Sequence, residues 1–196
     1  MRNMENTEQA INQVIKKIDE MPYIFNSEAD IQGLVYSELL KEYTEPYPTA
    51  LLDSNRKIFL TNRVHREYFG GKGGRIDTVV FSKEEIGLID IYWLCIKTSE
   101  HPGYRPVQLQ DAIEIKIVGG KGEETLFAEI KKDIGRLTKL LKEKKTEKAH
   151  FILIIRWSTN NKSIKDRLDK AEKLAKELCE KNGIQFYYNK YKILFK

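Results

Sequence analysis

Cysteine and long apolar runs are scarce in this chain, and each shortage excludes a class of protein. The two cysteines among its 196 residues, Cys95 and Cys179, lie far apart and show no zinc-ligand spacing. We therefore expect a reduced, cytoplasmic protein with packing cysteines and not a disulfide-built secreted fold. No run approaches the ~20 apolar residues of a membrane span, and MRNMENTEQA lacks the apolar core of a signal peptide. We expect no membrane association.

Charge of both signs is abundant, over a substantial apolar fraction. Hydrophobic residues make up 41% of the chain and charged residues 32%, with 34 Lys and Arg against 29 Asp and Glu. This mixture is typical of one folded domain and excludes a disordered chain. The net charge of +5 is compatible with a polyanionic partner such as DNA but does not require one.

The spacing of apolar residues predicts an α/β fold. Helical periodicity covers 5–20, a segment capped by Asn26 or Ser27, 123–144, and 163–181 before Gly183. Strand patterns cover 57–69, 75–81, 111–120, HFILIIRW, IQFYYN and YKILF, while 85–97 fits a strand or a short helix. Helices, then strands, then helix–strand–helix–strand predict a single domain with a central mixed sheet flanked by helices.

The stretch IEIKI carries charges that a core strand does not need. Ile113, Ile115 and Ile117 share one strand face, so Glu114 and Lys116 lie together on the other. A salt-bridged edge strand explains this pair in the simplest way.

A second strand, RIDTVVF, also holds an acid among apolar residues. A carboxylate such as Asp77 is costly there unless it is paired or binds a cation. With Glu114 it would form an oxygen-rich site suited to Mg²⁺ or Mn²⁺. Lys116 could orient or deprotonate a water, or neutralise charge on a phosphate. These residues suit phosphodiester cleavage; Asp90 is an alternative to Asp77.

The motifs GRID and EIK, followed by a helix and HFILIIRW, resemble those of the PD-(D/E)XK nuclease superfamily, which includes many restriction endonucleases. The resemblance covers about residues 25 to 160 and implies an αβββαβ core. It implies that Asp77 and Glu114 bind Mg²⁺ or Mn²⁺, with the Ile115 carbonyl as a third ligand, and that Lys116 is the catalytic lysine. Asp77 follows Ile76 where the family often has proline.

The superfamily often adds a glutamate from its first core helix. Glu28 fits this role best, and Glu38 is the alternative. The resemblance also divides the chain into an N-terminal helical extension, 1–24, and a nuclease-like domain, 25–196.

Several basic residues near these motifs are candidates for nucleic-acid binding. Arg75 shares a strand face with Asp77, where it would contact the scissile phosphate or pair with an acid. Lys72 lies in GGKGG, and Lys132 and Arg136 lie on a basic helix that otherwise would be a solvated surface.

We therefore predict a Mg²⁺-dependent DNA endonuclease. The alternatives are an inactive nucleic-acid-binding module with the same fold and a plain α/β interaction protein. Cutting two strands commonly needs two active sites, so a homodimer is a further option.

Overall fold

The computed structural model describes residues 3–21, 25, 27–44, 47–49, 59–69, 74–82, 108–118, 122–157 and 161–192. The helices are α1 (Asn3–Glu20), α2 (Glu28–Glu42), α4 (Glu123–Lys142) and α5 (Lys162–Asn182). The strands are β1 (Tyr47–Thr49), β2 (Phe59–Thr61), β3 (Val64–Phe69), β4 (Arg75–Phe81), β5 (Leu109–Val118), β6 (Thr146–Trp157) and β7 (Gln185–Lys192). Each predicted helix is present, with ends shifted by a few residues at most.

Five strands form one mixed sheet in the order β3-β4-β5-β6-β7. The β3–β4 and β4–β5 pairs are antiparallel, whereas β5–β6 and β6–β7 are parallel and are connected through α4 and α5. Among the described elements, and apart from the separate β1–β2 pair, α2, β3, β4, β5, α4 and β6 follow one another in the expected αβββαβ order. The predicted fold class, a single α/β domain around a mixed sheet, is confirmed.

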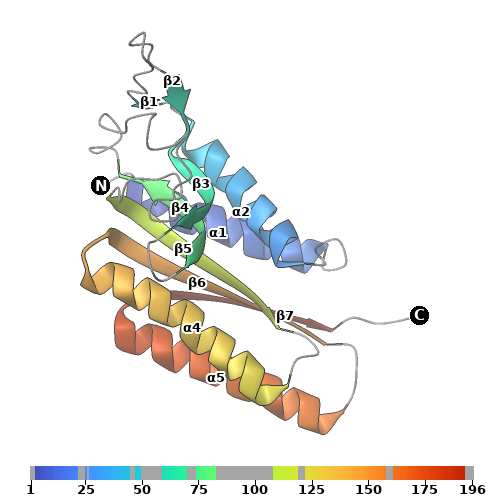
Figure 1. Ribbon diagram of the computed structural model, residues 1–196. Coiled ribbons are helices and arrows are strands. Elements are labelled where there is room, and N and C mark those ends of the chain that lie inside the picture. The colour runs from blue at the N-terminus through green and yellow to red at the C-terminus, as the bar shows by residue number, and fades with distance from the viewer. Residues whose placement is uncertain are drawn as a thin grey trace.

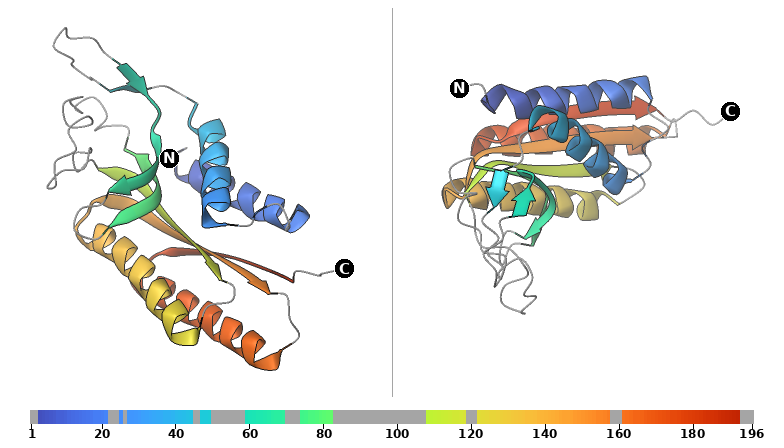
Figure 2. Two further views of the ribbon diagram at one scale, coloured as in Figure 1. Left: turned by 45° about the vertical axis from the view of Figure 1, so that its right-hand side comes forward. Right: turned by 90° about the horizontal axis from the view of Figure 1, so that it is seen from above.

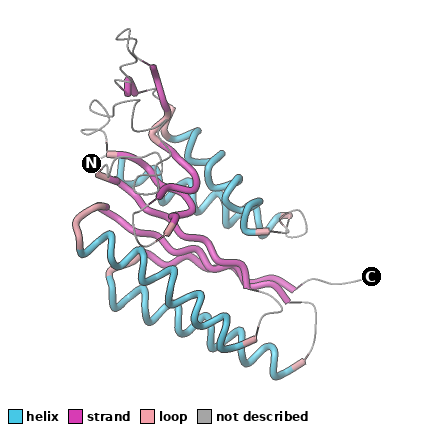
Figure 3. Tube along the Cα trace, in the orientation of Figure 1, coloured by secondary structure: helices cyan, strands magenta, loops and turns pink. Residues whose placement is uncertain are grey.

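Helices cover both faces of the sheet. Figure 1 shows α1 and α2 on one face and α4 and α5 on the other, and the left view of Figure 2 shows the same three layers. The short β1–β2 pair forms a separate two-stranded sheet, which lies beyond the end of β3 in Figure 3.

Two apolar cores, one on each face, explain the pattern of β5 and β6. Ile113 and Ile115 pack with α1 and α2, so Glu114 and Lys116 are on the α4 side. On β6, Ile152 belongs to the same core as Ile113, while its neighbour Leu153 belongs to the core under α4 and α5. The prediction that HFILIIRW is covered on both faces is confirmed.

The prediction of one strand over 57–69 was wrong. Within its described part the chain is divided between β2 and β3, with Asn62 and Arg63 between them. Arg63 is 2% exposed, and its guanidinium donates to the Phe81 carbonyl and to Gln110 Oε1, at 2.9 and 2.5 Å. These bonds turn the chain inward at a residue that sequence alone assigns to a continuous strand.

The prediction of two strands at the C-terminal end was also wrong. IQFYYN and the start of YKILF form one strand, β7, that pairs with β6 from Gln185 to Lys192. The register with β6 continues without interruption, so the polar Asn189 and Lys190 do not end the strand. Asn189 is buried and donates to Asp19 of α1 at 2.7 Å, which satisfies its amide nitrogen.

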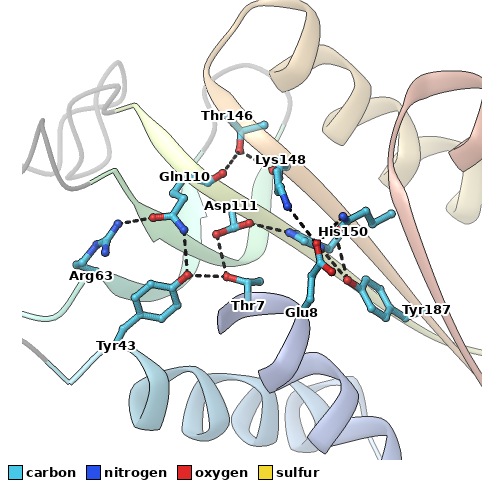
Figure 4. A network of polar contacts seen from close by, with 11 residues as sticks. Thr7, Glu8, Tyr43, Arg63, Gln110, Asp111, Thr146, Lys148, His150 and Tyr187 are labelled. Atoms are coloured by element: carbon cyan, nitrogen blue, oxygen red, sulfur yellow. Dashed lines mark hydrogen bonds and ion pairs between the residues drawn. The ribbon is translucent and has the colours of Figure 1, made fainter. Parts of the chain in front are cut away.

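A buried polar network fastens α1 to the sheet (Figure 4). Thr7 of α1 donates to Asp111 Oδ2 of β5 at 2.8 Å, and His150 Nε2 of β6 lies 2.8 Å from Asp111 Oδ1. The Thr7 hydroxyl also contacts the Tyr43 hydroxyl at 2.8 Å. The segment expected to be an N-terminal extension is therefore part of the same packed structure as α2 and the sheet.

Several predictions fall outside the described residues: the strand or helix at 85–97, Asp90, Cys95 and Lys72. Cys179 is described and is fully buried in the core under α5. Among the helices that are described, none has the length and apolar character needed to cross a membrane.

Candidate active site

The site lies where β4 and β5 separate. Their pairing runs from Phe81 and Leu109 to Thr78 and Ile113 and goes no further. Beyond that point two carboxylates bind the backbone of β5 in place of a strand partner. Asp77 Oδ2 accepts from the Ile115 N–H at 2.7 Å. A second carboxylate, from α2, accepts from the N–H two residues further along β5, that of Ile117.

That second carboxylate belongs to Glu28, the first residue of α2. Ser27 caps the helix in a capping box with Asp30, so of the two predicted caps it is Ser27 that is used. The cap fixes where α2 begins and brings Glu28 Oε1 to the Ile117 N–H, at 3.3 Å. The other candidate from this helix, Glu38, lies elsewhere: its Oε1 pairs with Lys17 and Lys41.

Asp77 is held at the opening from two sides. Its Oδ1 accepts from Gln32 Nε2 of α2 at 2.8 Å, and its Oδ2 accepts from the Ile115 N–H. Burial raises the pKa of Asp77 to about 6, although the hydrogen bonds from Ile115 and Glu114 act in the opposite direction. On β3, between Arg66 and Tyr68, Glu67 has a φ of 52°, a left-handed conformation that is strained for a residue with a side chain.

Glu114 is the most buried acid of the site, with 1% of its side chain exposed. Burial, together with the charge of Asp77, raises its pKa to about 9, against the lowering effect of Arg136. Arg136 Nε donates to Glu114 Oε1 at 2.7 Å. Arg136 and Asp77 thus act on the pKa of Glu114 in opposite directions, because the guanidinium favours the ionised carboxylate and the negative charge of Asp77 favours the neutral acid.

Lys116 is surrounded by carboxylates. Its Nζ lies 3.1 Å from Glu28 Oε1, 3.1 Å from Asp133 Oδ2 and 3.8 Å from Glu129 Oε2. Burial alone would lower the pKa of this amine, but Asp133 and Glu28 outweigh it and raise the pKa. Lys116 is therefore an ammonium ion at neutral pH, and it cannot accept a proton in this state.

Carboxylates outnumber cations around the opening. The acids are Glu28, Asp77, Glu114, Glu129 and Asp133, and the bases in contact with them are Lys116 and Arg136. The raised pKa values of Asp77, Glu114 and Asp133 reflect burial and this excess of negative charge. Binding of a further cation, or of protons, would offset this excess of negative charge.

The donors fit Mg²⁺ or Mn²⁺. Within the described residues, no three His, Cys, Asp or Glu side chains are arranged to hold a metal ion by themselves. Mg²⁺ does not need three, because it keeps several waters and usually binds one or two carboxylates plus substrate phosphates. Asp77 and Glu114 supply two carboxylates. The Ile115 carbonyl points to the same strand edge as its N–H, toward Asp77, as strand geometry requires.

The basic residues predicted to bind nucleic acid are dispersed. Arg75 is exposed and pairs with Glu67, with 3.4 Å between Nη1 and Oε2, so the ion-pair alternative is the one observed. Lys132 is exposed on α4. Arg136 lies on the side of α4 that faces the site, where its guanidinium donates to Glu114.

Sequence reasoning missed Gln32, Glu129 and Asp133. Asp133 had a visible signal, because it falls between Ile130 and Leu137 on the buried stripe of α4, where an acid needs a partner. Gln32 carried none, since glutamine on a helix beside apolar residues is ordinary.

No family model, curated protein or solved structure matches this chain. The function must therefore be inferred from the residues of the site.

Proposed function

We propose that the chain is a divalent-metal-dependent endonuclease that hydrolyses phosphodiester bonds of DNA, with a site of the PD-(D/E)XK type. One observation carries this proposal. Asp77 and Glu114, on adjacent strands, meet at the β4–β5 opening, and Lys116 lies one pleat from Glu114. The order of the described elements also supports the proposal, because the resemblance to PD-(D/E)XK nucleases implies an αβββαβ core that contains the strands of Asp77 and Glu114.

Asp77, Glu114 and the Ile115 carbonyl would hold the metal. Bound Mg²⁺ lowers the pKa of a coordinated water and offsets negative charge on the phosphate. Gln32 and the Ile115 N–H orient Asp77 through one hydrogen bond to each of its oxygens. These two bonds hold the Asp77 carboxylate in place at the β4–β5 opening.

Lys116 acts as a cation. Because its amine is charged, it stabilises the negative charge that develops on the phosphate oxygens during in-line attack and does not deprotonate the water. Glu28 fits a water-orienting role. Its Oε1 contacts Lys116 and the Ile117 N–H, and 38% of its side chain is exposed, so solvent reaches it.

Plasmid nicking tests this function. We expect wild type to nick plasmid with Mg²⁺ and not with EDTA, and Lys116→Ala to lose about 10²- to 10³-fold in rate. Lys148→Ala is the matched control, because Lys148 also pairs with a glutamate, Glu8, and is 23% exposed on neighbouring β6. Circular dichroism would establish that each variant is folded. Equal rates for wild type and Lys116→Ala would reject the proposed site.

An inactive nucleic-acid-binding module is the second candidate. The hydrogen bond from Arg136 to Glu114 favours it, because a buried acid that already binds an internal cation needs no metal. This candidate predicts DNA binding that is insensitive to EDTA, with no nicking at any Mg²⁺ concentration.

A further inference from the structure

Arg136 is hydrogen-bonded to the carboxylate of Glu114, which is one of the two proposed metal ligands. Its Nε donates to Glu114 Oε1 and its Nη2 donates to Asp133 Oδ1, both at 2.7 Å. The guanidinium thus joins α4 to β5, with 18% of the side chain exposed. Of the bases in the site, it is the one bound to Glu114.

The residue before β4 lies against this guanidinium. A Cβ built on Gly74 would lie 3.5 Å from Arg136 Nη1, which is an ordinary van der Waals contact. Gly74 has a φ of +99°, which disfavours any other residue there. The guanidinium therefore lies between the glycine before β4, the acid on β5 and the acid on α4.

A metal ion and a guanidinium compete for the same carboxylate. Both are cations, and each gains most by approaching the oxygens of Glu114 directly. Asp133 is different, because it also binds Lys116 and lies on α4 with Arg136, one turn away. The bond to Asp133 can thus persist when the bond to Glu114 is broken.

Resting on the proposed function, we propose that Arg136 is a displaceable counter-ion of the metal site. It holds Glu114 in the metal-free protein, releases it when the metal binds, and then contacts the substrate phosphate while anchored on Asp133. An arginine suits the second task, since its planar fork matches two phosphate oxygens. Arg136 is thereby a positioning residue for Glu114 and a ligand of the substrate.

Metal affinity without DNA gives the first test. Isothermal titration with Mn²⁺ should show Arg136→Gln binding at least about tenfold more tightly than wild type, because the competing cation is gone. Lys148→Gln removes one positive charge from the neighbouring strand at similar exposure and should bind as wild type does. A purely structural Arg136 would give equal or weaker binding on removal.

The Arg136 side chain itself gives the second test. In ¹⁵N-arginine-labelled protein, the Arg136 Nε–H should exchange slowly with solvent without metal and rapidly when Mg²⁺ is added. Nicking by Arg136→Gln should be slower than wild type despite the tighter metal binding, with Arg136→Lys between the two. Tighter binding together with slower cleavage is the combination that a structural role does not give.

The outcomes separate the two proposals. If wild type binds Mn²⁺ and cuts DNA, but Arg136→Gln has unchanged affinity and the Nε–H stays protected, the counter-ion proposal alone is wrong. If wild type neither binds Mn²⁺ nor cuts, both are overturned.

Discussion

Glu114 shows how burial sets the chemistry of single residues in this protein. Its carboxyl has almost no exposure, lies beside Asp77, and has a pKa of about 9 against an ordinary 4.5. Between these two pH values the folded protein keeps a proton that the unfolded chain has released. The unfolded state then binds fewer protons, so stability decreases as pH rises through this window.

The first prediction at this scale concerns Glu114→Gln. The amide mimics the neutral carboxyl, so it should remove this pH dependence in metal-free protein. From pH 7 to 9 in EDTA, wild type should lose up to roughly 3 kcal/mol more unfolding free energy than the variant. Urea unfolding at each pH measures this. Parallel pH profiles for the two proteins would show that Glu114 is ionised already at pH 7.

Sequence alone identified some residues of the site and not others. Asp77, Glu114 and Lys116 could be found because a charge within an apolar strand demands a partner. Glu28 could be proposed only together with Glu38, since both lie on one helix and the choice depends on how α2 crosses β5. Arg136 was predicted to bind nucleic acid because its helix is basic, and its pairing with Glu114 could not be predicted because that partner is distant in sequence.

At the scale of elements, the separation of β4 and β5 creates the site, and the buried network holds α1 beside it. Thr7, Asp111 and Tyr43 come from α1, β5 and the end of α2, and all three are buried. Leaving such groups without partners is costly, because water cannot replace the lost bonds. The network should therefore contribute to stability without taking part in catalysis.

Substitution of Thr7 by valine tests the network. The variant leaves Asp111 Oδ2 and the Tyr43 hydroxyl each without one bond, and should lose about 1–3 kcal/mol of unfolding free energy. Thr138→Val is the control, because the half-buried Thr138 hydroxyl donates only to the Ile134 carbonyl of its own helix. Equal losses in the two variants, measured by urea unfolding, would contradict a special role for the network.

The elements themselves were predictable to different degrees. Helices were found because apolar residues recur at helical spacing and the caps Ser27 and Gly183 mark two ends. The strand break at Arg63 was not, because it depends on bonds to Phe81 and Gln110, which are far along the chain. Local pattern reveals the type of an element, and tertiary contacts decide where it breaks.

At the scale of the whole molecule, the fold brings distant segments to one point. The helix starting at Glu28, the strand holding Asp77, the strand holding Glu114 and the helix holding Asp133 meet where the sheet opens. The class of fold followed from the order of helices and strands. The order of strands in the sheet did not, because it depends on which apolar faces pack together.

The most direct test is a crystal structure of wild type with Mn²⁺, examined by anomalous diffraction. We expect one strong peak between β4 and β5, about 2 Å from a carboxylate oxygen of Asp77 and from one of Glu114. Arg136 should have left Glu114 in the same map. Asp77 and Glu114 sharing no peak, at a Mn²⁺ concentration that supports nicking, would contradict the proposed metal site.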